Sequence, residues 1–213
     1  MTPRTKEQNE EIRLRRLAQI RKAAADVFLD KGPLLEIRDV AAQAELGYGT
    51  VYHYYSNKND LLYDLLWDAL ERAGEWLEPL LKAQLKAPPE GPAAAAELGP
   101  AAAVRLLQLW AEDHALYLLY KLAGEGFAQL PDARSAPLSA AFRREVLAPF
   151  TALLEAGLAA DRAAAAGGNA AEPPYRLQRA EMLLAALAGC AALSLRRGKL
   201  HEEAGEIVRF LKL

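Results

Sequence analysis

Hydroxyl and imidazole groups gather on one face of a short helix that we predict at residues 48–55. Val51 and Tyr55 are four residues apart, so they share one side of this helix, which we expect to face the core. The opposite side receives four polar side chains: Tyr48, Thr50, Tyr52 and His53. Such groups bind phosphate oxygens and base edges, so this face has the chemistry of a nucleic-acid contact. The alternative for the tyrosines is packing against neighbours, which we expect in part for Tyr54 and Tyr55.

The residues before this face predict the elements that position it. Four apolar residues recur at helical spacing and predict a helix of about two turns: Ile37, Val40, Ala41 and Ala44. The turn Glu45–Gly47 interrupts that helix, with Leu46 expected under the corner and Gly47 suited to cap the next helix. Two short helices joined by a tight turn, with a third helix directly after, form a DNA-reading helix-turn-helix.

Lys58 lies in the first turn of the third helix, which we predict to begin at Asn57. The helix macrodipole slightly disfavours a cation in that turn. A contact with a DNA phosphate would explain why a lysine stands there, so Lys58 is a candidate for backbone binding.

The segment Ile20–Leu62 resembles the DNA-binding domain of the TetR family of transcriptional regulators. The resemblance is sharpest in Gly49–Tyr55, which reads GTVYHYY, and at Lys58 with Leu61–Leu62. Further matching positions lie in the two preceding helices: Ile20, Ala23, Ala24, Phe28, Gly32 and Ile37–Ala41.

The resemblance implies a role for each reader residue. It implies base contacts from Arg38, Tyr48, Gly49 and Tyr52. It implies phosphate contacts from Thr50, His53, Tyr54 and Lys58. The chain departs from the family pattern at Glu36, Glu45 and Gly47, where the family usually has Thr, Gly and Ser. The changed caps are weaker by about 0.5 kcal/mol each, and Glu45 adds a negative charge near the expected phosphate path.

Charge is distributed unevenly along the 213 residues, whose net charge is −2. Residues 1–22 carry seven basic and three acidic side chains, a net of +4, so the remainder carries −6. A basic end on an acidic body suits a protein that docks DNA with one face. A solvated amphipathic helix is the alternative explanation for the basic end.

The residues needed for several other functions are missing from the sequence. The histidines His53, His114 and His201 are far apart and stand in no HExxH or CxxC pattern, so we expect no metal site and no cofactor. No dinucleotide fingerprint, P-loop or GxSxG motif occurs, so we do not expect an enzyme. The single Cys190 excludes an intrachain disulfide and favours a cytoplasmic location. The longest uncharged apolar run, Met182–Leu195, is too short to span a bilayer, so we expect no membrane contact.

Helical periodicity continues through the rest of the chain, and we find no alternating stretch that predicts a strand. The first helix is predicted to stop at Lys31–Pro33. The predicted later helices are Asn57 to about Lys86, Ala101–Gln129 with a corner near Asp113–His114, Leu138–Ala160 with a kink at Pro149, Tyr175–Arg197 and His201–Leu213. The predicted breaks are Ala87–Pro92, Pro131–Pro137 and Arg162–Pro174.

Aromatic side chains are frequent in the middle helices, where they either build the core or line a small-molecule pocket. Five residues are the candidates for the pocket: Trp110, His114, Tyr117, Tyr120 and Phe150. For any one of them, core packing is at least as good an explanation. The family resemblance implies an inducer in this region, and the composition favours an apolar or amphipathic effector.

Small residues mark the penultimate helix and suit close packing of helices across a two-fold axis. The candidate interface residues are Ala185, Ala188, Gly189, Ala192 and, on the last helix, Phe210. Burial within one chain is the alternative, but the family resemblance implies a homodimer.

We therefore expect an all-α protein with a three-helix N-terminal helix-turn-helix domain (residues 1–56) and a larger helical ligand-binding and dimerisation domain (57–213). We expect it to act as a ligand-released repressor that binds an inverted-repeat operator in double-stranded DNA as a homodimer. One rival is a helical small-molecule or acyl-group binding protein without specific DNA binding, and another is a helical enzyme.

Overall fold

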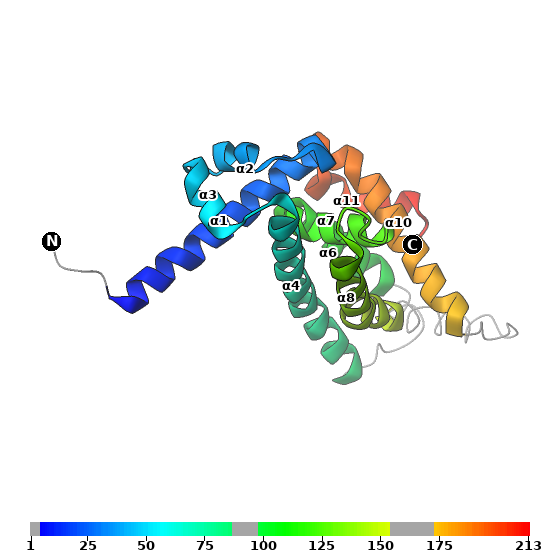
Figure 1. Ribbon diagram of the computed structural model, residues 1–213. Helices are drawn as coiled ribbons and strands as arrows, with labels where there is room; N and C mark the ends of the chain where they lie inside the picture. Colours follow the sequence, from blue (N-terminus) through cyan, green and yellow to red (C-terminus); the bar gives the residue numbers. More distant parts are fainter. Residues whose placement is uncertain (1–4, 87–97, 154–172) are drawn as a thin grey trace, which may run out of the picture.

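The computed structural model describes residues 5–86, 98–153 and 173–213, and within these ranges every regular element is a helix. The first three α-helices, α1 (Lys6–Lys31), α2 (Ile37–Gln43) and α3 (Tyr48–Tyr54), lie together on one side of the molecule (Figure 1). The longer helices of the remaining chain pack beside them (Figure 1). The predicted fold class, an N-terminal helix-turn-helix followed by a larger helical part, is confirmed.

The ends of α1 are set by local chemistry. The Thr5 hydroxyl accepts a hydrogen bond from the Gln8 N–H (3.2 Å), and the Gln8 side chain accepts one from the Thr5 N–H (3.1 Å). This reciprocal pair satisfies two of the free donors at the helix start. At the other end, Gly32 takes a φ of +58°, which glycine adopts at little cost, and starts the 3₁₀ turn η1 (Gly32–Leu34). The predicted stop is confirmed.

We call α1 to α3 together, residues 6–54, the reader. Helix α4 (Lys58–Lys86) joins the reader to the rest of the protein. The Asn57 side chain accepts a hydrogen bond from the Asp60 N–H (3.0 Å), so Asn57 is the cap rather than the first helical residue. The helix buries an apolar stripe against α7 and continues to Lys86, the last residue described in this part of the chain. This stripe consists of Leu61, Leu62, Leu65, Leu66, Ala69, Leu70, Ala73 and Leu77. The break predicted at 87–92 lies outside the described residues.

A sharp corner separates α6 (Leu98–Glu112) from α7 (His114–Gly124). The Asp113 carboxylate caps α7 by accepting hydrogen bonds from the N–H groups of Ala115 (3.0 Å) and Leu116 (3.3 Å), which confirms the predicted corner. The predicted extension of the helix to Gln129 is wrong. Helix α7 stops at Gly124 because Gly126 and Phe127 both take positive φ values, which a helix does not contain.

The loop predicted at Pro131–Pro137 is also wrong, because α8 (Asp132–Phe142) begins directly after Pro131. A proline before the first turn costs nothing, since the N–H groups there have no partner within the helix. Pro137 removes one hydrogen bond, but the helix around it buries Leu138, Ala141 and Phe142. Proline content alone was therefore a poor guide here.

Helix α8 runs into one wide π-helical segment, η2 (Arg143–Leu147), directly before Pro149, and residues 148–153 continue as α-helix. The missing N–H of Pro149 accounts for irregular hydrogen bonding at the position of the predicted kink. The predicted inward residues up to Leu153 are buried: Phe142, Val146, Phe150 and Leu153. The remainder of that predicted helix lies outside the described residues.

Helices α10 (Pro173–Arg196) and α11 (Leu200–Phe210) close the fold and match the last two predicted helices. The loop predicted before them, Arg162–Pro174, lies outside the described residues up to 172. Helix α7 occupies a central place because it packs against α1, α4, α6 and α10. Any movement of α7 therefore acts on α4, the helix that follows the reader.

Candidate nucleic-acid interface and effector domain

The two sides of α3 differ sharply in exposure. Val51 is fully buried and Tyr55 is 5% exposed, so the predicted core side of this helix is confirmed. Tyr48 and Tyr52 are 54% and 47% exposed, and their ring centroids lie 5.2 Å apart. Two large rings in contact on an open helix face form a preorganised surface, because neither ring needs to be ordered on binding.

The other reader residues surround this pair. A Cβ atom on Gly49 would meet no atom within 4 Å, so the backbone there is open to close approach. His53 is exposed and Thr50 is half-buried. The half-buried Tyr54 ring meets the His53 ring edge-on, with centroids 5.6 Å apart. The structure thus places these predicted contact residues together on or beside α3.

Arg38 stands apart from them, in the first turn of α2. Its guanidinium is mostly exposed and pairs with the Glu36 carboxylate (2.7 Å). The Glu36 N–H donates to the Asp39 carboxylate (3.2 Å), which forms one half of a capping box at the start of α2. Lys31 bonds to the same carboxylate (2.7 Å), and this contact, above all, lowers the pKa of Asp39.

The turn between α2 and α3 contains a strained residue. Glu45 has a φ of +53°, a conformation that favours glycine, which is the residue of the family pattern. Leu46 is half-buried against the core, as predicted. The Gln19 side chain donates a hydrogen bond to the Ala44 carbonyl (2.7 Å) and thereby ties the turn to α1. Sequence reasoning missed Gln19, because its partner lies 25 positions away.

Lys58 has a partner within the protein. Its ammonium group donates a hydrogen bond to the Pro33 carbonyl oxygen over 2.7 Å. This contact joins the start of α4 to the connection between α1 and α2. It offers a structural reason for a lysine at this helix start, beside the predicted phosphate contact.

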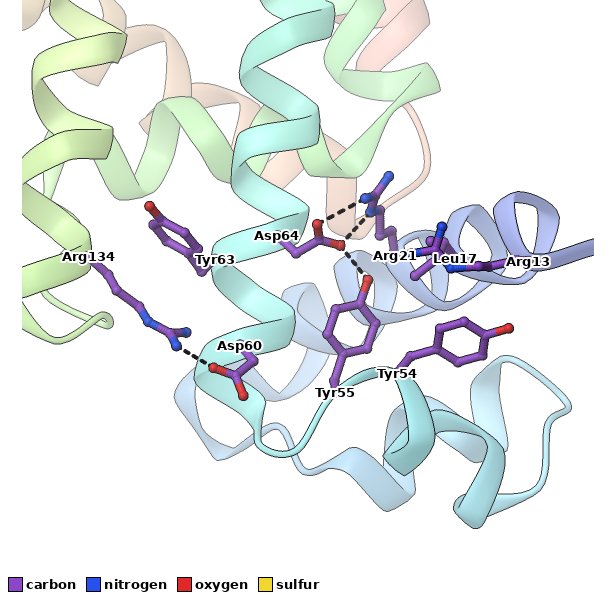
Figure 2. A pocket seen from close by; sticks show the side chains of 9 residues that line it. All are labelled: Arg13, Leu17, Arg21, Tyr54, Tyr55, Asp60, Tyr63, Asp64 and Arg134. Atoms are coloured by element: carbon purple, nitrogen blue, oxygen red, sulfur yellow. Dashed lines mark hydrogen bonds and ion pairs between the residues drawn. The ribbon is translucent and has the colours of Figure 1, made fainter. Parts of the chain in front are cut away.

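Partly buried charged groups beside the helix-turn-helix join α3 and α1 to α4 (Figure 2). Tyr55, directly after α3, donates its hydroxyl hydrogen to Asp64. Arg21 of α1 donates to both oxygens of the same carboxylate, at 2.7 and 3.0 Å, and also pairs with Asp68. Burial and then the bond to Asp64 raise the pKa of Tyr55, so its phenol stays protonated and remains the donor.

The same chain of charges continues to α7. Asp68 pairs with Arg72 one turn later on α4, and Arg72 Nε donates to the Asp113 carboxylate over 2.8 Å. Asp113 is the cap of α7. We call the series Tyr55–Asp64–Arg21–Asp68–Arg72–Asp113 the charge relay of this protein. It links the end of the reader helix to the start of α7 without a gap.

A surface cleft of about 360 Å³ opens between α1, the α3–α4 connection and α8 (Figure 2). Arg134 of α8 pairs with Asp60 in the first turn of α4, and its guanidinium carbon lies 5.2 Å from the centre of the Tyr63 ring. The cleft therefore contains a second direct tie between the reader's stalk and the later helices. The remaining residues around it are Arg13, Leu17, Arg21, Tyr54, Tyr55 and Asp64.

The predicted effector residues do not all meet. Trp110 of α6 and Tyr120 of α7 are buried with ring centroids 5.1 Å apart, and Tyr117 lies 5.7 Å from Trp110. Phe150 is fully buried on the helical residues after η2. His114 is bound elsewhere, because its Nδ1 pairs with Asp26 of α1 over 2.6 Å. It is a contact between α1 and α7 rather than part of the aromatic cluster.

The predicted interface residues lie in different environments. On α10, Ala185 and Gly189 are exposed and Ala192 is half-buried, whereas Ala188 is buried within the chain. Leu193 and Phe210 are 68% and 76% exposed, which is high for large apolar side chains. Sequence reasoning missed Leu193, although its spacing of four from Gly189 places it on the same helix face.

The described residues also bear on whether the chain has a membrane-spanning helix or a metal site. No helix in these ranges is long and apolar enough to cross a membrane. The same residues contain no group of three or more His, Cys, Asp or Glu side chains that could hold a metal ion.

Solved structures share this fold at low sequence identity. FadR of Bacillus halodurans, a fatty acid degradation regulator, is 17% identical, with 92% of this chain and 94% of that chain covered and a TM-score of 0.59. FadR of Bacillus subtilis in complex with stearoyl-CoA is 18% identical, with 91% and 96% covered and a TM-score of 0.55. These likenesses concern the fold.

The sequence itself matches one family model, and the match covers the helix-turn-helix. No curated protein matches the chain. Residues 20–65 match the model of the tetR family of bacterial regulatory proteins. This range runs from the buried part of α1 through α3 and into α4. The N-terminal helix-turn-helix of this chain therefore matches the DNA-binding part of the tetR family of bacterial regulatory proteins.

Proposed function

We propose that this protein is a transcriptional repressor that binds an inverted-repeat operator as a homodimer and leaves the DNA when a small molecule binds. The observation that carries the proposal is the face of α3, where Tyr48 and Tyr52 stand exposed while Val51 and Tyr55 hold the helix in the core. Residues 1–56 would serve as the reader and 57–213 as the effector and dimerisation domain, acting in the cytoplasm.

Tyr48, Gly49 and Tyr52 would contact bases in the major groove, and Arg38 would reach a base or phosphate from the start of α2. Thr50, His53, Tyr54 and Lys58 would hold the phosphates on either side. The exposure of Tyr48 and Tyr52 and the open backbone at Gly49 support this assignment.

The homodimer would form through α10 and α11. On α10, Met182, Ala185, Gly189 and Leu193 are exposed at spacings of three and four residues, which places them on one face. Phe210 of α11 adds a second exposed apolar side chain. A two-fold dimer through this face would present two readers to half-sites about 34 Å apart.

The effector would bind in the helical domain around α6 and α7. The Bacillus subtilis FadR structure contains stearoyl-CoA, and a further structure of this fold (17% identity, 92% of this chain and 95% of that chain covered, TM-score 0.50) is of a gamma-butyrolactone receptor. Such ligands are partly or wholly apolar. The buried aromatic cluster of Trp110, Tyr117 and Tyr120 supports an effector of similar character here.

Release from DNA would follow from movement of α7. The charge relay connects its cap, Asp113, to Tyr55 at the end of α3 through α4 and α1. A ligand that prefers a shifted α7 would therefore favour a conformer in which the two readers no longer match successive grooves.

Fluorescence anisotropy tests the DNA-binding part directly. The probe is the promoter DNA upstream of the protein's own gene, titrated at several salt concentrations, with random DNA of equal length as control. Tight, salt-dependent binding that favours the promoter is expected. Equally weak binding to promoter and random DNA, followed by the same result on a selected random library, would support the rival reading of a helical ligand-binding protein without specific DNA binding.

A further inference from the structure

Two tyrosines on α7 differ in a way that bears on the effector. The Tyr117 hydroxyl donates a hydrogen bond to the Ala188 carbonyl of α10 (3.3 Å). The Tyr120 hydroxyl, one turn later and equally buried, has no hydrogen-bond partner. Folded proteins rarely leave a buried hydroxyl unpaired, because its lost contact with water is not replaced.

Three indole N–H groups, those of Trp67, Trp76 and Trp110, share this condition, and the last two lie beside Tyr120. The N–H of Trp110 has no partner, and the Trp110 ring packs on the Tyr120 ring at 5.1 Å. The N–H of Trp76, on α4, is also unpaired, although it lies close enough to Tyr120 to lower the pKa of that phenol, against a larger rise caused by burial. Three helices thus bring three unpaired polar groups to one place in the core.

The chemistry of these groups shows which kind of hydrogen-bond partner they lack. An indole N–H only donates hydrogen bonds, and a protonated phenol donates one hydrogen. The cluster therefore offers three donor hydrogens and has one acceptor of its own, the Tyr120 oxygen, which the Trp76 N–H approaches. The cost of leaving these donors unpaired would be recovered if a bound molecule supplied an oxygen acceptor.

Charge in the surroundings argues against an ionic partner. Among the described residues, the buried polar or charged side chains are Thr151 and Ser194. Both hydroxyls already donate, to the Leu147 carbonyl and the Glu203 carboxylate. Burial is the main influence on the pKa of both the Tyr117 and the Tyr120 phenols, which it raises. Arg196 and Glu125 act on the pKa of the Tyr117 phenol in opposite directions. A carboxylate or ammonium group placed beside Tyr120 would therefore lose its hydration without a directly bound counter-ion, which is costly in an apolar core.

We propose that the effector is an uncharged, largely apolar molecule with a carbonyl-type oxygen, and that Tyr120, Trp110 and Trp76 donate to that oxygen. This inference rests on the proposed function, because it assigns a ligand class to the effector domain. Tyr117 and Phe142 would shape the site through their rings, which contact Trp110 and Tyr120 respectively.

The binding test uses the full-length protein and probes of matched chain length. The neutral probes are 2-decanone, 2-dodecanone and δ-dodecalactone, and the charged probes are decanoate and dodecanoate, all below their micelle concentrations. Stearoyl-CoA is a separate arm. Tryptophan fluorescence reports binding, because Trp110 and Trp76 are part of the site. We expect the neutral series to bind more tightly than the carboxylates.

A matched pair of variants tests the donors. Tyr120→Phe should weaken binding of the neutral probes about five- to tenfold, which is the range of one hydrogen bond. Tyr117→Phe should change it by less than about twofold, since its hydroxyl is already used. Thermal unfolding without ligand gives a second readout. Tyr120→Phe should leave the melting temperature unchanged or higher, whereas Tyr117→Phe should lower it.

Several outcomes would overturn the ligand class: carboxylates or stearoyl-CoA binding while the neutral series does not, no probe binding at all, or equal destabilisation by the two variants. These outcomes are independent of the promoter titration described above. A protein that binds its promoter but prefers charged probes remains a regulator with another ligand class. A protein that binds neutral probes but no DNA retains the ligand site and loses the proposed function.

Discussion

The Lys58 ammonium group and the Pro33 carbonyl oxygen are joined by a 2.7 Å hydrogen bond between the start of α4 and the α1–α2 connection. A cation in the first turn of a helix is slightly unfavourable, and this bond gives it a fixed internal partner. A lysine carries three donor hydrogens, so the same group retains donors for a DNA phosphate. Lys58 is therefore expected to act on both stability and DNA binding.

Lys58→Ala tests this double role. Loss of a phosphate contact should weaken binding to all DNA sequences similarly and reduce the slope of log K against log salt by about one unit. Loss of the Pro33 contact should also lower the melting temperature of the free protein. Lys121→Ala, which removes an exposed lysine on α7, is the control and should change neither quantity. A loss confined to one sequence would contradict the phosphate role.

Tyr52→Ala should abolish promoter-specific binding and leave the fold intact, because the side chain stands exposed on α3 and touches mainly Tyr48. Anisotropy with promoter and random DNA measures the first effect, and circular dichroism with thermal melting measures the second. Tyr55→Phe provides the contrasting variant. It removes the partly buried hydrogen bond to Asp64 and should lower the melting temperature while sequence preference is retained. Unchanged promoter affinity in Tyr52→Ala would show that Tyr52 does not read a base.

Glu45 offers a gain-of-function test, because its φ of +53° is unfavourable for any residue with a Cβ atom. Glu45→Gly should relieve this strain and stabilise the free protein by about 0.5–1 kcal/mol. It should also raise DNA affinity, because a negative charge leaves the expected phosphate path. Glu45→Gln separates the two effects, since it removes the charge and keeps the strain. Equal melting temperatures for wild type and Glu45→Gly would show that the turn is not strained.

Local features of the fold were predictable from the sequence, whereas the long-range polar contacts were not. Helical periodicity identified α1 to α4, the Lys31–Pro33 signal located the end of α1, and the corner near Asp113 was predicted between α6 and α7. The prediction of a loop at Pro131–Pro137 was wrong, because the position of a proline within a helix decides whether it breaks that helix. The contact between His114 and Asp26 could not be predicted, because the two residues are distant in sequence.

The same limitation applies to the charge relay. Arg21 and Arg72 look like exposed residues of amphipathic helices, and their acidic partners lie on other helices or other turns. Periodicity tells which face of a helix is apolar but not which charged side chain meets another across an interface. The unpaired hydroxyl of Tyr120 could not be predicted either, because the lack of a hydrogen-bond partner is visible only in the structure.

Arg72→Met should uncouple α7 from the reader. Arg72 connects Asp68 on α4 to the α7 cap Asp113, so its removal interrupts the charge relay at one link. Coupling between sites is reciprocal, so operator binding should slow hydrogen exchange in the first turns of α7 in the wild type. In Arg72→Met this remote protection should be lost while promoter affinity falls only slightly. Arg105→Met, which breaks the exposed pair with Glu112 on α6, is the control and should retain it. Full protection in Arg72→Met would show that the relay carries no coupling.

The proposed dimer face gives the last prediction. Leu193 and Phe210 expose large apolar surfaces on neighbouring helices, and burying such surfaces against a second copy is the main favourable contribution to association. Leu193→Asp combined with Phe210→Asp should convert the dimer to a monomer without unfolding it, because neither side chain supports the core of its own chain. Light scattering after size exclusion measures the mass, and circular dichroism checks the fold.

Leu34→Asp is the matched control, since Leu34 is also a highly exposed leucine but lies in η1 beside the reader. It should leave the mass of the dimer unchanged. The monomeric double variant should also lose tight binding to an inverted repeat and keep weak binding to a single half-site, because two linked readers bind with a higher effective concentration than one. If the double variant remains a dimer, the two chains meet through another surface, and the geometry proposed for the paired readers is wrong.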